Sequence, residues 1–118
     1  MTERVRITTS VAHVLAVLLD DPQAERYGLE IMRATGLPSG TLYPILTRLQ
    51  EAGWLQADWE DIDPAAAGRP ARRYYRLTAQ GAAAARAELN ALYARLRPRA
   101  AGGPRPAGAT TFQPVPGW

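Results

Sequence analysis

Apolar residues recur at helical spacing in three segments of the N-terminal half. The first segment follows the hydroxyl residues Thr8, Thr9 and Ser10, one of which is the expected N-cap, and its apolar positions fit the i, i+3, i+4, i+7, i+8 rule: Val11, Val14, Leu15, Leu18 and Leu19. Further short helices are predicted over residues 27–35, stopped by Gly36, and over about residues 38–52, ended by Gly53. Two such helices joined by a tight turn are typical of a helix-turn-helix.

After Gly53 apolar and polar residues alternate, with a period of two. The segments WLQADWE (54–60) and RRYYRLT (72–78) predict two strands, with Tyr75 and Leu77 facing the core. Residues 61–71 contain two prolines and a glycine, which predicts a turn-rich loop and therefore a hairpin with a long tip. Thr78 is the expected cap of a last helix over residues 79–97, which has one apolar stripe: Leu89, Leu92, Tyr93 and Leu96.

This order of elements predicts a mainly α fold with a small β-hairpin. Residues 1–78 form a winged helix-turn-helix in this interpretation, and residues 79–97 form one appended C-terminal helix. Residues 98–118 hold nine Pro or Gly in 21 positions and are expected to be a disordered tail. The alternative for the tail is docking through Phe112 and Trp118.

The third predicted helix carries a proline inside its apolar pattern. Pro44 crowds the carbonyl of Gly40, which has no side chain to resist a bend. Glycine also permits close approach of another molecule, and hydroxyls lie beside a helix N-terminus that favours anions. In a helix-turn-helix this leading turn enters the major groove. The candidate DNA contacts are Ser39, Gly40, Thr41, Tyr43, Pro44 and Arg48. Alternatively, Pro44 only adjusts packing and Tyr43 is a core residue.

Charge is divided unevenly along the chain. Residues 1–63 carry five Arg against ten Asp and Glu, whereas residues 64–118 carry nine Arg against one Glu, and the net charge is +3. Such a basic region indicates an anionic partner. In the second strand and the loop before it, Arg69 and Arg73 are the favoured phosphate ligands, while Arg72 and Arg76 are expected beside acids. The alternative is a solvated face paired across the hairpin with Asp58, Glu60, Asp61 and Asp63.

Other functional classes find little support in the sequence. There is no Cys and one His, His13, so disulfides, thiolate sites and histidine metal clusters are excluded. Ser10 and Ser39 lack a base, and GLPSGTLY lacks the GK[ST] ending of a phosphate-binding loop. No apolar run reaches the roughly 18 residues of a membrane span, and no secretory signal is present. We expect a cytoplasmic protein with no membrane partner, no cofactor and no enzymatic activity.

A homodimer follows from the weak charge of the third helix. Arg48 is its only basic residue, so one copy would bind DNA weakly, and specific affinity requires two helices in successive grooves. The first and last helices are the natural interface, because each has more apolar positions than the rest of one chain is expected to cover. The expected contacts are Val11, Val14, Leu18, Leu89, Leu92, Tyr93 and Leu96.

Three segments together resemble the PadR-like transcriptional regulators. They are YGLEI (27–31), GTLYPILTRLQEAGWL (40–55) and GRPARRYYRLTAQG (68–81). The resemblance implies a homodimeric, nucleoid-associated repressor of the small branch with a single C-terminal helix, which packs against the partner's first helix. It implies operator binding through the third helix and wing, and release by a small hydrophobic or aromatic effector. The positions that match the DNA-contacting motif are Ser39, Thr41, Tyr43, Arg48, Arg69, Arg72 and Arg73.

Two rival functions remain open at the level of sequence. A winged-helix module could dock an acidic protein through the third helix and bind no DNA. A ligand-sensing scaffold could place Trp54 and Trp59 around a flat aromatic molecule, although both could equally pack the wing against the helices. Arg4 and Arg6 are candidate phosphate contacts in an N-terminal arm.

Overall fold

The computed structural model describes residues 5–98. The elements in chain order are α1 (Thr9–Asp20), β1 (Arg26–Tyr27), α2 (Gly28–Thr35), α3 (Ser39–Glu51), β2 (Leu55–Trp59), α4 (Pro64–Ala67), β3 (Arg73–Leu77) and α5 (Ala79–Leu96). This is a mainly helical chain with a small antiparallel sheet, as predicted. Arg4 and the tail after Pro98, with Phe112 and Trp118, lie outside the described residues.

Local capping explains where the helices begin and end. The hydroxyl of Thr8 accepts a hydrogen bond from the Val11 amide at 3.1 Å, which confirms an N-cap among the three hydroxyl residues. Gly36 ends α2 with φ 75°, and Gly53 follows α3 with φ 82°. Both have the left-handed conformation that glycine adopts at little cost. The boundaries of these helices therefore match the sequence prediction closely.

The sheet has one more strand than expected, in the order β1-β3-β2. β1 pairs Tyr27 with Tyr74, and β2 pairs Leu55 with Leu77 and Trp59 with Arg73. The prediction of only two strands was wrong, because a strand of two residues is too short to show alternation.

The hairpin tip also contains a helix where only a loop was predicted. In α4 the carboxylate of Asp63 accepts a hydrogen bond from the Ala65 amide at 3.1 Å, and Gly68 closes the turn with φ 72°. Proline in the first turn of a helix has no amide to lose there, so Pro64 starts this helix.

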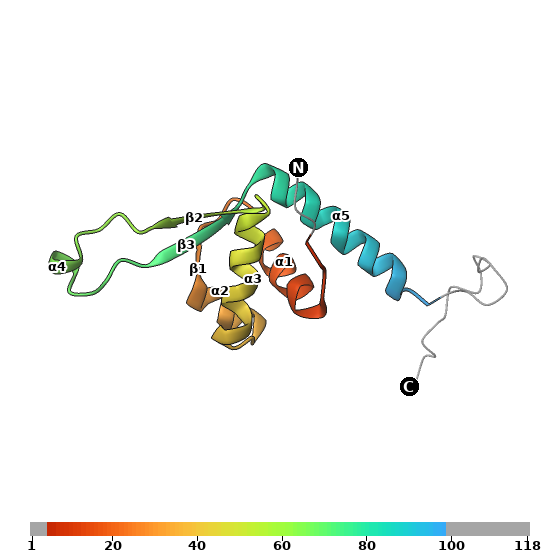
Figure 1. Ribbon diagram of the computed structural model, residues 1–118, viewed down its shortest axis with the longest axis horizontal. Helices are drawn as coiled ribbons and strands as arrows, with labels where there is room; N and C mark the ends of the chain where they lie inside the picture. The colour runs from red at the N-terminus through yellow and green to blue at the C-terminus, as the bar shows by residue number, and fades with distance from the viewer. Residues whose placement is uncertain (1–4, 99–118) are drawn as a thin grey trace, which may run out of the picture.

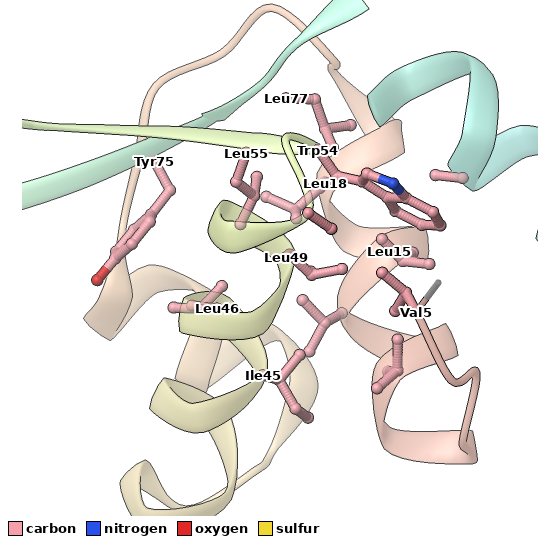
Figure 2. Close-up of a cluster of buried hydrophobic side chains, with 14 of the residues drawn as sticks. Val5, Leu15, Leu18, Ile45, Leu46, Leu49, Trp54, Leu55, Tyr75 and Leu77 are labelled. Atoms are coloured by element: carbon pink, nitrogen blue, oxygen red, sulfur yellow. The ribbon is translucent and has the colours of Figure 1, made fainter. Parts of the chain in front are cut away.

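The core lies between α1, α3 and the base of the sheet (Figure 2). Trp54, Tyr75 and Leu77 are each 6% exposed, which confirms that Tyr75 and Leu77 face the core. The expectation that Val11, Val14 and Leu18 contact a second subunit was wrong. These side chains are at most 2% exposed because they lie in the core of their own chain, where α1 packs on α2, α5 and β3.

α5 is fixed to the body at its first turn. The Thr78 amide donates to the Trp54 carbonyl at 3.0 Å, and the Thr78 hydroxyl donates to the Gly53 carbonyl at 2.7 Å. That hydroxyl also accepts from the Gly81 amide at 2.9 Å and so caps the helix. Past its first turns α5 runs alongside α1 and projects beyond it, away from the wing (Figure 1). Among residues 5–98, no helix is long and apolar enough to cross a membrane.

Candidate nucleic-acid interface

The leading turn of α3 faces solvent, whereas its opposite side is buried. Ser39, Gly40 and Thr41 are exposed, and Tyr43 is 40% exposed. The buried side consists of Leu42, Ile45, Leu46 and Leu49, each at most 7% exposed. Tyr43 is therefore not a core residue. Pro44 is also exposed, and α3 continues through it to Glu51.

The side of Gly40 where a side chain would stand faces open space. A Cβ built on Gly40 would meet no other atom within 4 Å, so nothing in the described chain requires glycine at this position. The helix backbone is accessible here to another molecule, as the sequence interpretation proposed. Arg48, farther along the same helix, is exposed as well.

Tyr43 is held against the start of α2. A Cβ built on Gly28 would lie 2.9 Å from two carbons of the Tyr43 ring, a distance that side chains do not tolerate. Gly28 thus allows the tyrosine to lie across the junction of the two helices. Sequence reasoning missed this role of Gly28, because the contact joins residues from different helices and has no local pattern.

Glu60, just beyond the outer end of β2, accepts hydrogen bonds from several donors. Its carboxylate accepts from both terminal nitrogens of Arg69, at 2.7 and 3.0 Å, from the Arg72 backbone amide at 3.1 Å and from the Tyr27 hydroxyl at 3.1 Å. These bonds, that from Arg69 foremost, lower the pKa of Glu60 to about 2. The Tyr27 pKa is raised, chiefly by the same hydrogen bond to Glu60. From the sequence, Glu60 was predicted only as one of four acids that could pair with the wing arginines across the hairpin.

The pairing expected for the wing arginines was wrong for two of them. Arg69, the favoured phosphate ligand, is the residue that pairs with Glu60. The Arg72 guanidinium, expected beside an acid, instead lies 5.7 Å from the centre of the Tyr27 ring. The reason is the α4 turn, which folds Arg69 back toward β2. Arg76 behaves as predicted, since it lies 3.7 Å from a carboxylate oxygen of Glu25.

Arg73 remains a candidate phosphate ligand and stacks on a tryptophan. Its guanidinium carbon lies 5.1 Å from the centre of the Trp59 ring, directly across the β2–β3 ladder. Trp59 is 61% exposed, whereas Trp54 is buried in the core. Among the described residues the two tryptophans therefore share no pocket. The idea that both pack the wing against the helices was right for Trp54 and wrong for Trp59.

A small cavity joins the helix-turn-helix to the wing. Its volume is about 250 Å3, and its walls include Tyr27 and Gly28, Tyr43 of α3, and Arg72, Arg73 and Tyr75 along the wing strand. Tyr43 and the two arginines, which the sequence assigned separately to helix and wing, thus line one cavity. Tyr75 and Tyr27 join them without having been predicted as site residues.

The apolar stripe of α5 changes from covered to exposed along its length. Leu89 packs partly against the core and Leu92 is half-buried, but Tyr93 and Leu96 are each 68% exposed. On the outer side of α1, His13, Ala16 and Val17 line a shallow groove together with Ala34 of α2.

Comparison with known proteins gives consistent matches. A model described as the transcriptional regulator PadR-like family matches residues 14–87 of the 118 in the chain. A PadR family transcriptional regulator from Eggerthella lenta DSM 2243 is 25% identical, over 75% of this chain and 78% of that one, with a TM-score of 0.56.

Two further structures share the fold at lower identity. The protein smu.1704 from Streptococcus mutans UA159 is 21% identical over 79% of this chain and 86% of that one, with a TM-score of 0.59. A PadR family transcription regulator from Clostridium difficile R20291 is 20% identical over 75% and 86%, with a TM-score of 0.54. No functionally curated protein matches the chain.

Proposed function

Because the chain belongs to the PadR-like family of transcriptional regulators, we propose that it is a homodimeric repressor that binds a specific operator. Each subunit inserts the leading turn of α3 into the major groove and lays its wing along the adjacent backbone. Proteins of this family are DNA-binding regulators and not enzymes. In this proposal the protein acts on nucleoid DNA in the cytoplasm.

One observation carries the proposal: α3 and the wing present their contact groups around a common cavity. Tyr43 comes from the helix, and Arg72 and Arg73 come from the wing. Neither arginine forms a salt bridge within residues 5–98. Their charges are therefore available to phosphates, while Ser39 and Thr41 stand exposed for base edges or sugars.

The proposed homodimer uses the projecting half of α5. Tyr93 and Leu96 are large apolar residues that one chain leaves exposed, and Leu92 continues their stripe toward the body. Burying such a stripe against a second copy removes apolar surface from water. The outer face of α1, at Ala16 and Val17, is the proposed counterpart in place of Val11, Val14 and Leu18.

A further part of the proposal is release of the repressor from DNA by a small hydrophobic or aromatic effector. Trp54 is in the core and Trp59 lies on the wing, so neither lines an enclosed site among the described residues. An effector site would have to lie between subunits, beside Tyr93 and Leu96. Titration of the DNA complex with an aromatic effector, followed by duplex release, tests this part separately.

Fluorescence anisotropy with a labelled duplex from the promoter of the protein's own gene tests DNA binding at two salt concentrations. Arg73→Ala should weaken binding to all sequences and reduce the slope of the salt dependence by ~1 per subunit for each phosphate that Arg73 neutralises. Arg86→Ala removes the same charge from the exposed middle of α5 and is the matched control. Absence of binding by the wild type, together with recovery of an acidic protein partner, would support the interaction-module alternative instead.

A further inference from the structure

The cavity between α2, α3 and the wing is lined by several side chains that can donate hydrogen bonds. Tyr75 is only 6% exposed, yet it lines this cavity, and Figure 2 shows its hydroxyl directed away from the leucines of the core. The neighbour of that hydroxyl is the Arg73 guanidinium, which has donors only. No group among residues 5–98 accepts a hydrogen bond from this hydroxyl, and its oxygen is open to the cavity rather than sealed in the core.

The charge of the cavity is positive. Arg72 and Arg73 lie in its wall without a carboxylate partner among the described residues. Glu60 is bonded to the Tyr27 hydroxyl, but Arg69 balances its charge. Burial is the main influence on the Tyr75 pKa and raises it, so this phenol keeps its proton at neutral pH and can donate it. A cavity lined by two arginines and a phenol that keeps its proton suits an anion with several acceptor oxygens.

The position of the cavity identifies the source of that anion. In the proposed complex α3 occupies the major groove, and the wing contacts the DNA on the other side of one backbone strand. The strand that separates the two contacts must pass between α3 and β3, where the cavity opens. A non-bridging phosphate oxygen of this strand can enter the cavity, whereas base edges cannot reach it.

We propose that this cavity seats one backbone phosphate of the operator, held by Arg72 and Arg73 and by a hydrogen bond from the Tyr75 hydroxyl. The proposal rests on the DNA-binding function above and adds a role for Tyr75. The seated phosphate fixes α3 and the wing to the same DNA strand and so sets their relative register. This contact contributes affinity without reading the base sequence.

Tyr75→Phe removes only the hydroxyl, and the core packing of the ring stays in place. Removal of one hydrogen bond to a charged group in each half-site should raise the dissociation constant about tenfold or more. The rise should be the same for operator and unrelated duplexes. Tyr74→Phe is the matched control, because Tyr74 packs edge-on against Tyr27 and does not itself line the cavity. Its affinity should equal that of the wild type, and thermal unfolding should show both variants folded.

Single uncharged methylphosphonate linkages, placed in turn along the operator, then locate the phosphate. At one linkage per half-site the wild type should lose affinity, and Tyr75→Phe should lose clearly less, since the two changes remove the same bond. Equal affinities of Tyr75→Phe and wild type, or equal sensitivity to every linkage, would overturn the phosphate seat and leave the DNA-binding function standing. Absence of DNA binding by the wild type would overturn both.

Discussion

Gly81 is a residue whose importance the sequence does not reveal. It lies in the first turn of α5, where a Cβ would come 2.6 Å from the backbone carbon atoms of Trp54. Neither partner can move away without breaking the hydrogen bonds that Thr78 makes to the same carbonyls. The close approach of a helix to an extended backbone is therefore possible only with glycine here.

Gly81→Ala should lower the free energy of unfolding by about 2 kcal/mol or more, in the range of an overpacked core. Chemical denaturation of the full chain measures this. Ala83→Gly is a suitable comparison, because Ala83 is exposed in the same turn and should cost only the ~1 kcal/mol of a helical glycine. If both substitutions cost the same, the close approach to Trp54 does not limit position 81.

Glu60 should support DNA binding although it carries a negative charge. Glu60→Gln weakens the bonds that hold Arg69, the Arg72 amide and Tyr27, so we expect the wing to loosen and the dissociation constant for DNA to rise. Asp61→Asn removes the same charge from an exposed neighbour and should instead tighten binding, because it only reduces repulsion of phosphates. Tighter binding by both variants would contradict the positioning role of Glu60.

The same carboxylate predicts how the wing responds to acid. The pKa of Glu60 is depressed from 4.5 to about 2, so its network is favourable above pH 4.5 and is lost as the pH falls through about 2. Carbon-detected NMR titration should show Glu60 still ionised at pH 3, below the ordinary glutamate pKa of 4.5. A Glu60 titration midpoint near the ordinary value of 4.5 would rule out the network in solution.

At the scale of elements, most of the fold follows from local sequence signals. α1, α2, α3 and α5 were predictable because an apolar period coincides with a threonine cap at the start of α1 and α5, and with a stop glycine after α2 and α3. β1 and α4 were missed because two and four residues are too few to show a period. The candidate site was predictable as a pair of elements, α3 and the wing, but not as one cavity. The contacts that join them, such as Gly28 with Tyr43, cross between elements.

α3 offers a test that separates folding from DNA contact. Gly40→Ala places a methyl group in open space on a helix, which should raise the free energy of unfolding by ~0.5 to 1 kcal/mol. The same methyl group should weaken DNA binding if the backbone at Gly40 approaches the duplex as closely as proposed. Calorimetry and anisotropy on one protein sample measure both effects. Unchanged affinity in a stabilised variant would place the DNA farther from this turn.

At the scale of the whole molecule, α5 and the wing extend from the body in different directions (Figure 1). This arrangement suits the proposed complex, in which one end of the chain pairs with a second copy and the other contacts DNA. Substituting both Tyr93 and Leu96 with Ser should convert the dimer to a monomer in sedimentation experiments and leave the unfolding of each subunit nearly unchanged, since both residues are 68% exposed. A variant that stays dimeric would place the interface elsewhere.

A dimer built this way should select a palindromic operator. Two α3 helices related by a twofold axis reach successive major grooves when half-sites are about one helical turn apart. Selection of bound sites from random duplexes would show this spacing directly. Unpaired single half-sites among the selected duplexes would argue against twofold binding.

Thr78 is the one residue between β3 and α5, and it is bonded to the chain that leads into β2. No flexible linker therefore separates α5, the proposed dimer contact, from the wing, the proposed DNA contact. In the proposed dimer, any tilt of one α5 against the other would swing its wing about this joint. The distance between the two DNA-contacting surfaces would then depend on the angle at which the two α5 helices cross.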